Sequence, residues 1–173
     1  MRSMKNTSVR TRISAAATAI AASVALLISA TPAHAATYTT TSNCSVPWIT
    51  CSSGDLWLLY NSKEYAIQDG YYVTSWSMFY GNVSDYYGTS QYQGSTLTTY
   101  RYVFNGNGNG AWEYMKNNAA SVQNCGVDNY RVYYNSGYGG TSQYFAHREP
   151  YGDCVLTNLI SALKNNNASQ HFA

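Results

Sequence analysis

Four segments of the chain combine aromatic, β-branched and small polar residues in the pattern that predicts β-strands. They border the sequences GN, NGNGNG and SGYGG, whose glycines and asparagines are typical of turns. The four segments are YYVTSWSMFY (71–80), STLTTYRYVF (95–104), NYRVYYN (129–135) and TSQYFAH (141–147). A last short strand is expected in ASQHFA (168–173). The pattern therefore predicts an all-β fold.

One segment, VLTNLISALKN (155–165), has a different spacing of apolar residues. These positions fall on one side of a helical turn; they are Val155, Leu156, Leu159, Ile160 and Leu163. The spacing predicts a short packed helix.

The longest apolar run, ISAAATAIAASVALLISA (13–30), follows a basic segment and precedes TPAHAA. Ala33 and Ala35 form an A-x-A pattern, so residues 1–35 are expected to be a secretory signal peptide. A permanent membrane anchor is the weaker interpretation, because no later segment is comparably apolar. We expect the remaining residues, 36–173, to form a single secreted, extracellular domain without membrane attachment.

Removing the predicted signal peptide changes the charge. Four of the ten basic residues leave and all eight acids stay, so the net charge goes from +2 to −2 (6 − 8). The remaining bases are scattered along the chain, which argues against a nucleic-acid partner. Only 10% of the residues are charged and eighteen are tyrosines. Such a composition is typical of half-buried β-surfaces and also of uncharged contact surfaces.

Two sequence features occur twice in the same order. CSSGDLWLLYNS (51–62) is followed by KNNAAS (116–121), and CGVDNYRVYYNS (125–136) is followed by KNNNAS (164–169). In both copies ten positions separate the Cys from the Asn of YNS. We interpret the copies, about 51–122 and 125–173, as two supersecondary units that stack around one core.

The first copy is longer than the second. Its YNS sequence lies 74 residues before the other YNS, whereas the KNN sequences are 48 apart, so it carries 26 extra residues. These fall within residues 65–112. We expect an enlarged hairpin or long loop there; a binding loop is the alternative.

All four cysteines lie beyond the predicted signal peptide, and an even number in an exported chain indicates two disulfides. Local pairing, Cys44 with Cys51 and Cys125 with Cys154, is the predicted connectivity. The rival is a bridge between Cys51 and Cys125, the equivalent positions of the two copies.

The aromatic strand, glycine turn, predicted helix and N-N-x-x-S segment, present twice, resemble the βγ-crystallin Greek-key motif. The chain is similar to secreted actinobacterial metalloproteinase inhibitors of that fold, peptidase inhibitor family thirty-six. The resemblance covers about residues 44–173. It implies a sandwich of two Greek keys, with a short helix in the second and an insertion in the first.

The resemblance also implies a calcium motif, (N/D)(N/D)xx(S/T)S. The matching residues are Asn117, Asn118, Ser121, Asn165, Asn166 and Ser169. The sixth position is Val122 or Gln170 instead of Ser, and no acid is adjacent, although calcium prefers carboxylates among its six to eight oxygen ligands. We therefore expect weak calcium binding at most and no other cofactor. The alternative role for these residues is loop architecture.

Inhibitors of this fold present a short disulfide-braced loop, and CSVPWITC (44–51) is the segment of that kind here. Its candidate contact residues are Val46, Pro47, Trp48, Ile49 and Thr50. The expected partner is an extracellular protease, bound by a monomer. The alternative for Trp48 is a core plug at the edge of the domain.

Catalysis has little support, because the chain lacks G-x-S-x-G, H-E-x-x-H and a phosphate-binding glycine loop. We expect a non-catalytic protein, most simply a peptidase inhibitor. A cell-wall carbohydrate-binding or toxin-like module is one alternative, since aromatic faces stack on sugar rings. A calcium-stabilised structural protein is the other.

Overall fold

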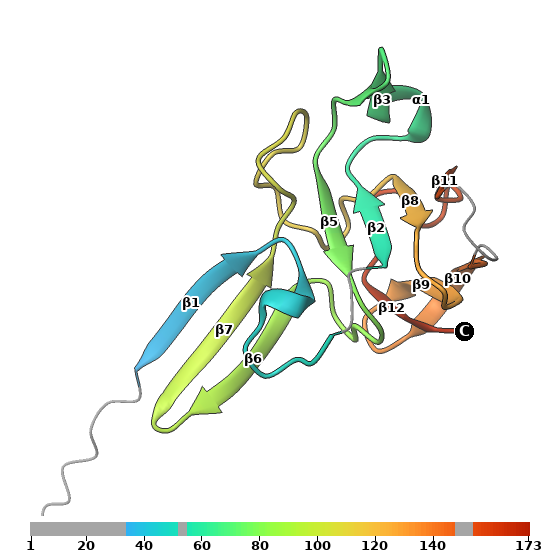
Figure 1. The fold of residues 1–173 in the computed structure, drawn as a ribbon. Coiled ribbons are helices and arrows are strands. Elements are labelled where there is room, and N and C mark those ends of the chain that lie inside the picture. Colours follow the sequence, from blue (N-terminus) through green and yellow to red (C-terminus); the bar gives the residue numbers. More distant parts are fainter. Residues whose placement is uncertain (1–33, 52–54, 148–153) are drawn as a thin grey trace, which may run out of the picture. The chain divides into compact units, whose positions relative to one another are not determined.

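Strands make up most of the regular structure in the computed structural model, which describes residues 34–51, 55–147 and 154–173 (Figure 1). All of these belong to one compact unit, residues 33–173. Of the predicted signal peptide, only His34 and Ala35 are described. The described helices are short: a 3₁₀ turn, η1 (Asn43–Ser45), and α1 (Lys63–Ala66).

Four strands form the first sheet, in the order β11-β8-β2-β5, and every neighbouring pair is antiparallel. They are β2 (Leu56–Leu59), β5 (Trp76–Phe79), β8 (Ser121–Asn124) and β11 (Val155–Asn158). A small hairpin, β3 (Ile67–Gln68) and β4 (Tyr71–Tyr72), lies in the connection between β2 and β5.

The second sheet has the order β10-β9-β12, with antiparallel neighbours. Its strands are β9 (Tyr130–Asn135), β10 (Gly139–Phe145) and β12 (Ser169–Phe172). An antiparallel bridge between Val83 and Gln170 adds the segment after β5 to the free side of β12. The backbone N–H of each residue donates to the carbonyl of the other, at 2.8 and 2.9 Å.

The strand order describes two Greek keys that exchange a strand. In the first copy, β2 lies between β5 and β8, while the third segment, around Val83, joins the second sheet. In the second copy, β9 lies between β10 and β12, while the third strand, β11, joins the first sheet. The predicted sandwich of two Greek keys is confirmed.

The core lies between the two sheets. Side chains along each strand point alternately to the two faces of the sheet, and those on the inner face form the core. Leu56 and Leu58 of β2 are fully buried, whereas Trp57 between them is only partly buried. On the other sheet, Tyr130 and Val132 of β9 are fully buried as well. Each sheet thus covers one face of the other.

A third sheet contains much of the extra sequence of the first copy. β6 (Gly88–Gln93) and β7 (Thr96–Tyr102) form an antiparallel hairpin, and β1 (Ala35–Thr40) pairs with β7 in parallel. These three strands lie side by side in Figure 1. The hairpin lies in the connection between Val83 and β8. The expected enlarged hairpin is therefore present in the first copy.

The helix predicted in residues 155–165 is wrong. Val155–Asn158 is the strand β11, which pairs with all four residues of β8, and a turn follows it. Pairing with a strand of the other copy outweighs the local helical spacing. Of the five apolar residues in the predicted stripe, only Leu159 and Leu163 are buried.

The disulfides pair Cys44 with Cys51 and Cys125 with Cys154, which is the local connectivity predicted from the sequence. The first closes a loop next to η1. The second connects the end of β8 to the start of β11, two strands that are neighbours in the first sheet. Two disulfides indicate a chain that folds in an oxidising compartment.

Candidate functional site

The repeated KNN sequences meet each other where the two copies join. Asn117 donates its backbone N–H to the carbonyl of Asn167 (2.8 Å), and Asn165 donates to the carbonyl of Ala119 (2.9 Å). The two hydrogen bonds are equivalent in the internal repeat, because residues 117 and 165, like residues 119 and 167, are 48 positions apart. Asn117 and Asn165 also share the left-handed backbone, with φ of 63° and 58°, a conformation that asparagine adopts more readily than most residues.

The serine of each KNN sequence anchors the YNS sequence of its own copy. Ser121 Oγ donates to the carbonyl of Asn61, and Ser169 Oγ donates to the carbonyl of Asn135, both at 2.6 Å. Both serines are fully buried and begin the last strand of their copy. The loop-architecture role expected as an alternative for these residues is what their contacts show.

Each junction of the copies has a pocket. The copy-one pocket is lined by residues that include Asn61, Ser62, Asn118, Ala120, Lys164 and Asn165. The copy-two pocket has the equivalent residues Asn135, Ser136, Asn166, Ala168, Lys116 and Asn117. The two pockets are therefore related by the internal repeat.

The predicted calcium residues are divided between these pockets and the interior. Asn118 meets Asn165 in the copy-one pocket, and Asn117 meets Asn166 in the copy-two pocket, so each pocket combines asparagines from both copies. At the sixth position of the motif, Val122 and Gln170 are both fully buried, and Gln170 hydrogen-bonds the hydroxyl of Tyr86 (2.9 Å).

Both pockets already contain a cationic side chain. Lys164 Nζ donates to Ser62 Oγ, and Lys116 Nζ donates to Ser136 Oγ, each at 2.8 Å. Lys116 also forms an ion pair with Asp85 at 3.0 Å. Within the described ranges, no cluster of three or more His, Cys, Asp or Glu residues is placed to hold a metal ion. Weak calcium binding stays a prediction, and the two ammonium groups oppose a second cation.

The copy-one pocket is the larger of the two, with a volume of about 540 Å³ against about 220 Å³. Two residues of the first copy, Tyr65 at α1 and Asn109 from the NGNGNG loop, contribute to its wall. Neither residue was predicted from the sequence to belong to a site. The 26-residue excess within 65–112 was the available signal, because it marks where the two copies cannot be equivalent.

Hydrogen bonds around Asn61 hold this wall in place. Its side-chain carbonyl accepts from Asn109 Nδ2 (3.1 Å), and its own Nδ2 donates to the carbonyl of Tyr65 (3.3 Å). The backbone of Asn109 is bonded on both sides as well, to Val73 (3.0 Å) and Ser75 (2.9 Å). The pocket is thus preformed by the fold.

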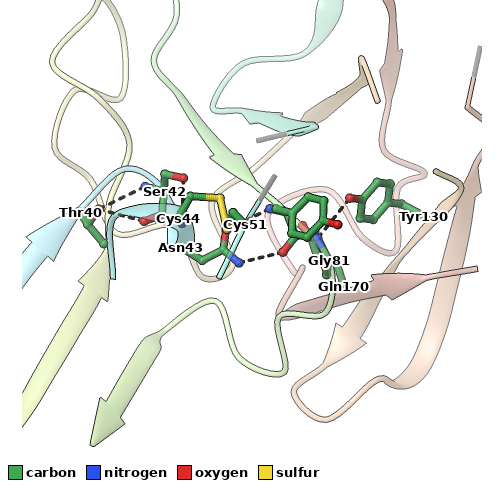
Figure 2. Close-up of a disulfide and its surroundings, with 9 residues drawn as sticks. Thr40, Ser42, Asn43, Cys44, Cys51, Gly81, Tyr130 and Gln170 are labelled. Atoms are coloured by element: carbon green, nitrogen blue, oxygen red, sulfur yellow. Dashed lines mark hydrogen bonds between the residues drawn. A yellow bond between two sulfur atoms is a disulfide. The ribbon is translucent and has the colours of Figure 1, made fainter. Parts of the chain in front are cut away.

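A second contact fixes the disulfide-braced loop to the residue that follows β5 (Figure 2). The buried side chain of Asn43 donates to the carbonyl of Tyr80 (2.8 Å) and accepts from its N–H (2.9 Å). Beyond Cys44 the chain forms a turn, in which Ile49 N–H donates to the carbonyl of Val46 (3.0 Å). The loop is therefore held by the disulfide at its base and by Asn43 beside it.

The side chains predicted to contact a protease point in different directions. Val46 belongs to the core, and Trp48 and Ile49 pack against it; Trp48 also meets the ring of Tyr100 edge-on at 5.4 Å. Pro47 and Thr50 are exposed. The structure thus places Trp48 as expected for the core-plug alternative and leaves Pro47 and Thr50 as the accessible candidates.

The largest pKa shifts belong to tyrosines of the core. Burial raises the pKa values of Tyr86, Tyr102 and Tyr130 well above the ordinary range for tyrosine. On the surface, the Asn158 amide donates to both carboxylate oxygens of Glu64 and lowers the pKa of that carboxyl. None of these groups lines the copy-one pocket, so the shifts do not indicate an acid–base site there.

Comparisons with known proteins give a limited result. No family model matches the sequence, and no curated protein matches it. Among solved structures, the chain is similar to one described as "Evolution of the eye lens beta-gamma-crystallin domain fold", with a TM-score of 0.38 and 13% sequence identity. The similarity covers 69% of this chain and 85% of the other.

No helix in the described part of the chain has the length and apolar character needed to cross a bilayer.

Proposed function

We propose that the protein is a secreted, non-catalytic inhibitor of an extracellular peptidase, most simply a metallopeptidase. The observation that carries the proposal is the loop between Cys44 and Cys51, which is closed by a disulfide and fastened at Asn43. A loop that is rigid before binding loses less conformational entropy in a complex.

The inward side chains of the loop contribute to this rigidity. Because Val46, Trp48 and Ile49 pack on the core, they hold the backbone while Pro47 and Thr50 project outward. Pro47 also restricts one backbone angle of the turn. We therefore assign the peptidase contacts to Pro47 and Thr50, and a supporting role to Trp48 and Ile49.

The test is inhibition of a panel of secreted metallopeptidases by the wild type and by Thr50→Arg. A long charged side chain at an exposed contact position should clash with the bound peptidase and weaken inhibition about tenfold or more. Thr141→Arg is the matched control, because Thr141 is an exposed threonine of β10. A wild type that inhibits no member of the panel, or a Thr50→Arg variant that inhibits as well as the control, would reject the proposal.

A further inference from the structure

The two repeat-related pockets provide an internal comparison within one molecule. Each has an Asn-Ser step from YNS, an alanine and asparagines from the KNN sequences, and a lysine bonded to the serine. These shared residues join the two Greek keys and would be present without any ligand. A function that belongs to one pocket alone must therefore depend on features that the other pocket lacks.

The copy-one pocket differs because the extra sequence of the first copy builds a wall on it. Asn109 closes one side and is fixed by hydrogen bonds to Asn61, Val73 and Ser75. Tyr65 also lines the pocket and is 73% exposed. The resulting volume, about 540 Å³, lies in the range of small-molecule sites, roughly 300–1,000 Å³.

The lining of this pocket is polar and almost uncharged. Asn61, Asn109, Asn118 and Asn165 supply amides, Ser62 a hydroxyl, and Tyr60 and Tyr65 aromatic rings with hydroxyls. Its single charged group, Lys164, already donates to Ser62 Oγ. Among the described residues, the Asn165 side-chain amide and both tyrosine hydroxyls have no hydrogen-bond partner in the protein, so they are available to a ligand.

We propose that the copy-one pocket binds a neutral saccharide, a function additional to peptidase inhibition and independent of the loop between Cys44 and Cys51. Sugar hydroxyls both donate and accept, which matches asparagine amides and tyrosine hydroxyls. The exposed ring of Tyr65 offers an apolar face on which a sugar ring can stack. No carboxylate lines the pocket, so a cationic ligand has no counter-ion there.

The probes are soluble trisaccharides of defined linkage: chitotriose, cellotriose, laminaritriose, maltotriose and mannotriose. Binding to the full mature protein is measured by isothermal titration calorimetry and by sugar-induced shifts of amide NMR signals. We expect at least one trisaccharide to bind at millimolar concentration or below. Failure of all five to bind would overturn the proposal.

Two variants locate the site. Tyr65→Ala should weaken binding about tenfold, because it removes the stacking face. Tyr65 is largely exposed, so this variant should remain folded. Asn118→Ala should weaken binding about three- to tenfold through the loss of its side-chain oxygen as an acceptor, since its Nδ2 already donates to the carbonyl of Tyr114 (2.8 Å).

The copy-two pocket supplies the matched control. Asn166 occupies the position equivalent to Asn118, so Asn166→Ala should leave trisaccharide affinity unchanged. Equal losses in both asparagine variants, or full affinity in Tyr65→Ala, would overturn the assignment to the copy-one pocket. Peptidase inhibition by Tyr65→Ala should equal that of the wild type, so failure of either proposal is distinguishable from failure of the other.

Discussion

Ser169 and Ser121 occupy equivalent positions in the two copies but make different numbers of hydrogen bonds. Ser169 Oγ donates to the carbonyl of Asn135 (2.6 Å) and accepts from the N–H of Tyr138 (3.1 Å). Ser121 Oγ makes only the equivalent of the first contact, a hydrogen bond that it donates to the carbonyl of Asn61 (2.6 Å). Both serines are fully buried, whereas the residues that accept from them are not: Asn61 is partly buried and Asn135 is exposed.

The two variants should therefore differ in stability by a predictable amount. Each lost hydrogen bond costs about 0.5–1.5 kcal/mol net. Ser121→Ala should lower the free energy of unfolding by about 0.5–1.5 kcal/mol, and Ser169→Ala by about 1–3 kcal/mol. Alanine leaves almost no cavity in place of serine, so packing changes little in either variant.

Urea unfolding of the oxidised protein, followed by tryptophan fluorescence, measures both values. The m-value should stay constant, since the surface exposed on unfolding is the same. Ser161→Ala, at an exposed serine of the turn after β11, is the control and should be neutral. A loss in Ser121→Ala equal to or greater than that in Ser169→Ala would refute the assignment of stability to these hydroxyls.

Three further predictions follow from the core, the disulfides and the pockets. Because burial raises the folded-state pKa of the three core tyrosines, their contribution to stability is complete below about pH 10, the unfolded value, and is lost as the pH rises. Above pH 10 the free energy of unfolding should fall by up to about 1.4 kcal/mol per pH unit for each tyrosine. A free energy of unfolding that stayed constant above pH 10 would contradict this prediction. Replacing both cysteines of the second disulfide, which are 29 residues apart, should cost about 3.5 kcal/mol, against about 2.5 kcal/mol for the first, 7 residues apart; denaturant titrations that reverse this order would count against the loop-entropy reasoning. Millimolar calcium should raise Tm by less than about 1 °C, since mass action gives little stabilisation at a weak site; a rise of many degrees that a chelator reverses would show a strong one.

The repeat was sufficient to predict two equivalent supersecondary units because it is local in each copy, and the family resemblance implied their Greek-key topology. The fixed spacing from Cys to YNS and the recurrent KNN sequence identify equivalent strands without any knowledge of their partners. The exchange of the third strand was not predictable in this way. It depends on pairing across the copies, as at Val83 with Gln170, and such pairing also turned residues 155–158 from the expected helix into β11.

The direction of side chains in the braced loop was equally inaccessible from the sequence. Trp48 and Ile49 look like exposed anchors in CSVPWITC, but the turn after Val46 directs them toward the core. The sequence could predict the disulfide that closes the loop, because its cysteines are close in the chain. It could not predict which loop residues remain accessible, because Asn43 and Tyr80, 37 positions apart, set the loop's orientation.

The copies share the contacts at their junction, whereas Tyr65 and Asn109 from the extra sequence of the first copy line the copy-one pocket and not the copy-two pocket. Stability and saccharide binding should for this reason respond to different substitutions. Loss of the buried hydroxyl of Ser169 removes hydrogen bonds within the second copy and should lower the free energy of unfolding. Loss of the exposed ring of Tyr65 removes little buried surface, so it should change affinity while the unfolding curve stays in place. A Tyr65→Ala variant that lost stability and affinity together would mean that Tyr65 supports the fold rather than a ligand.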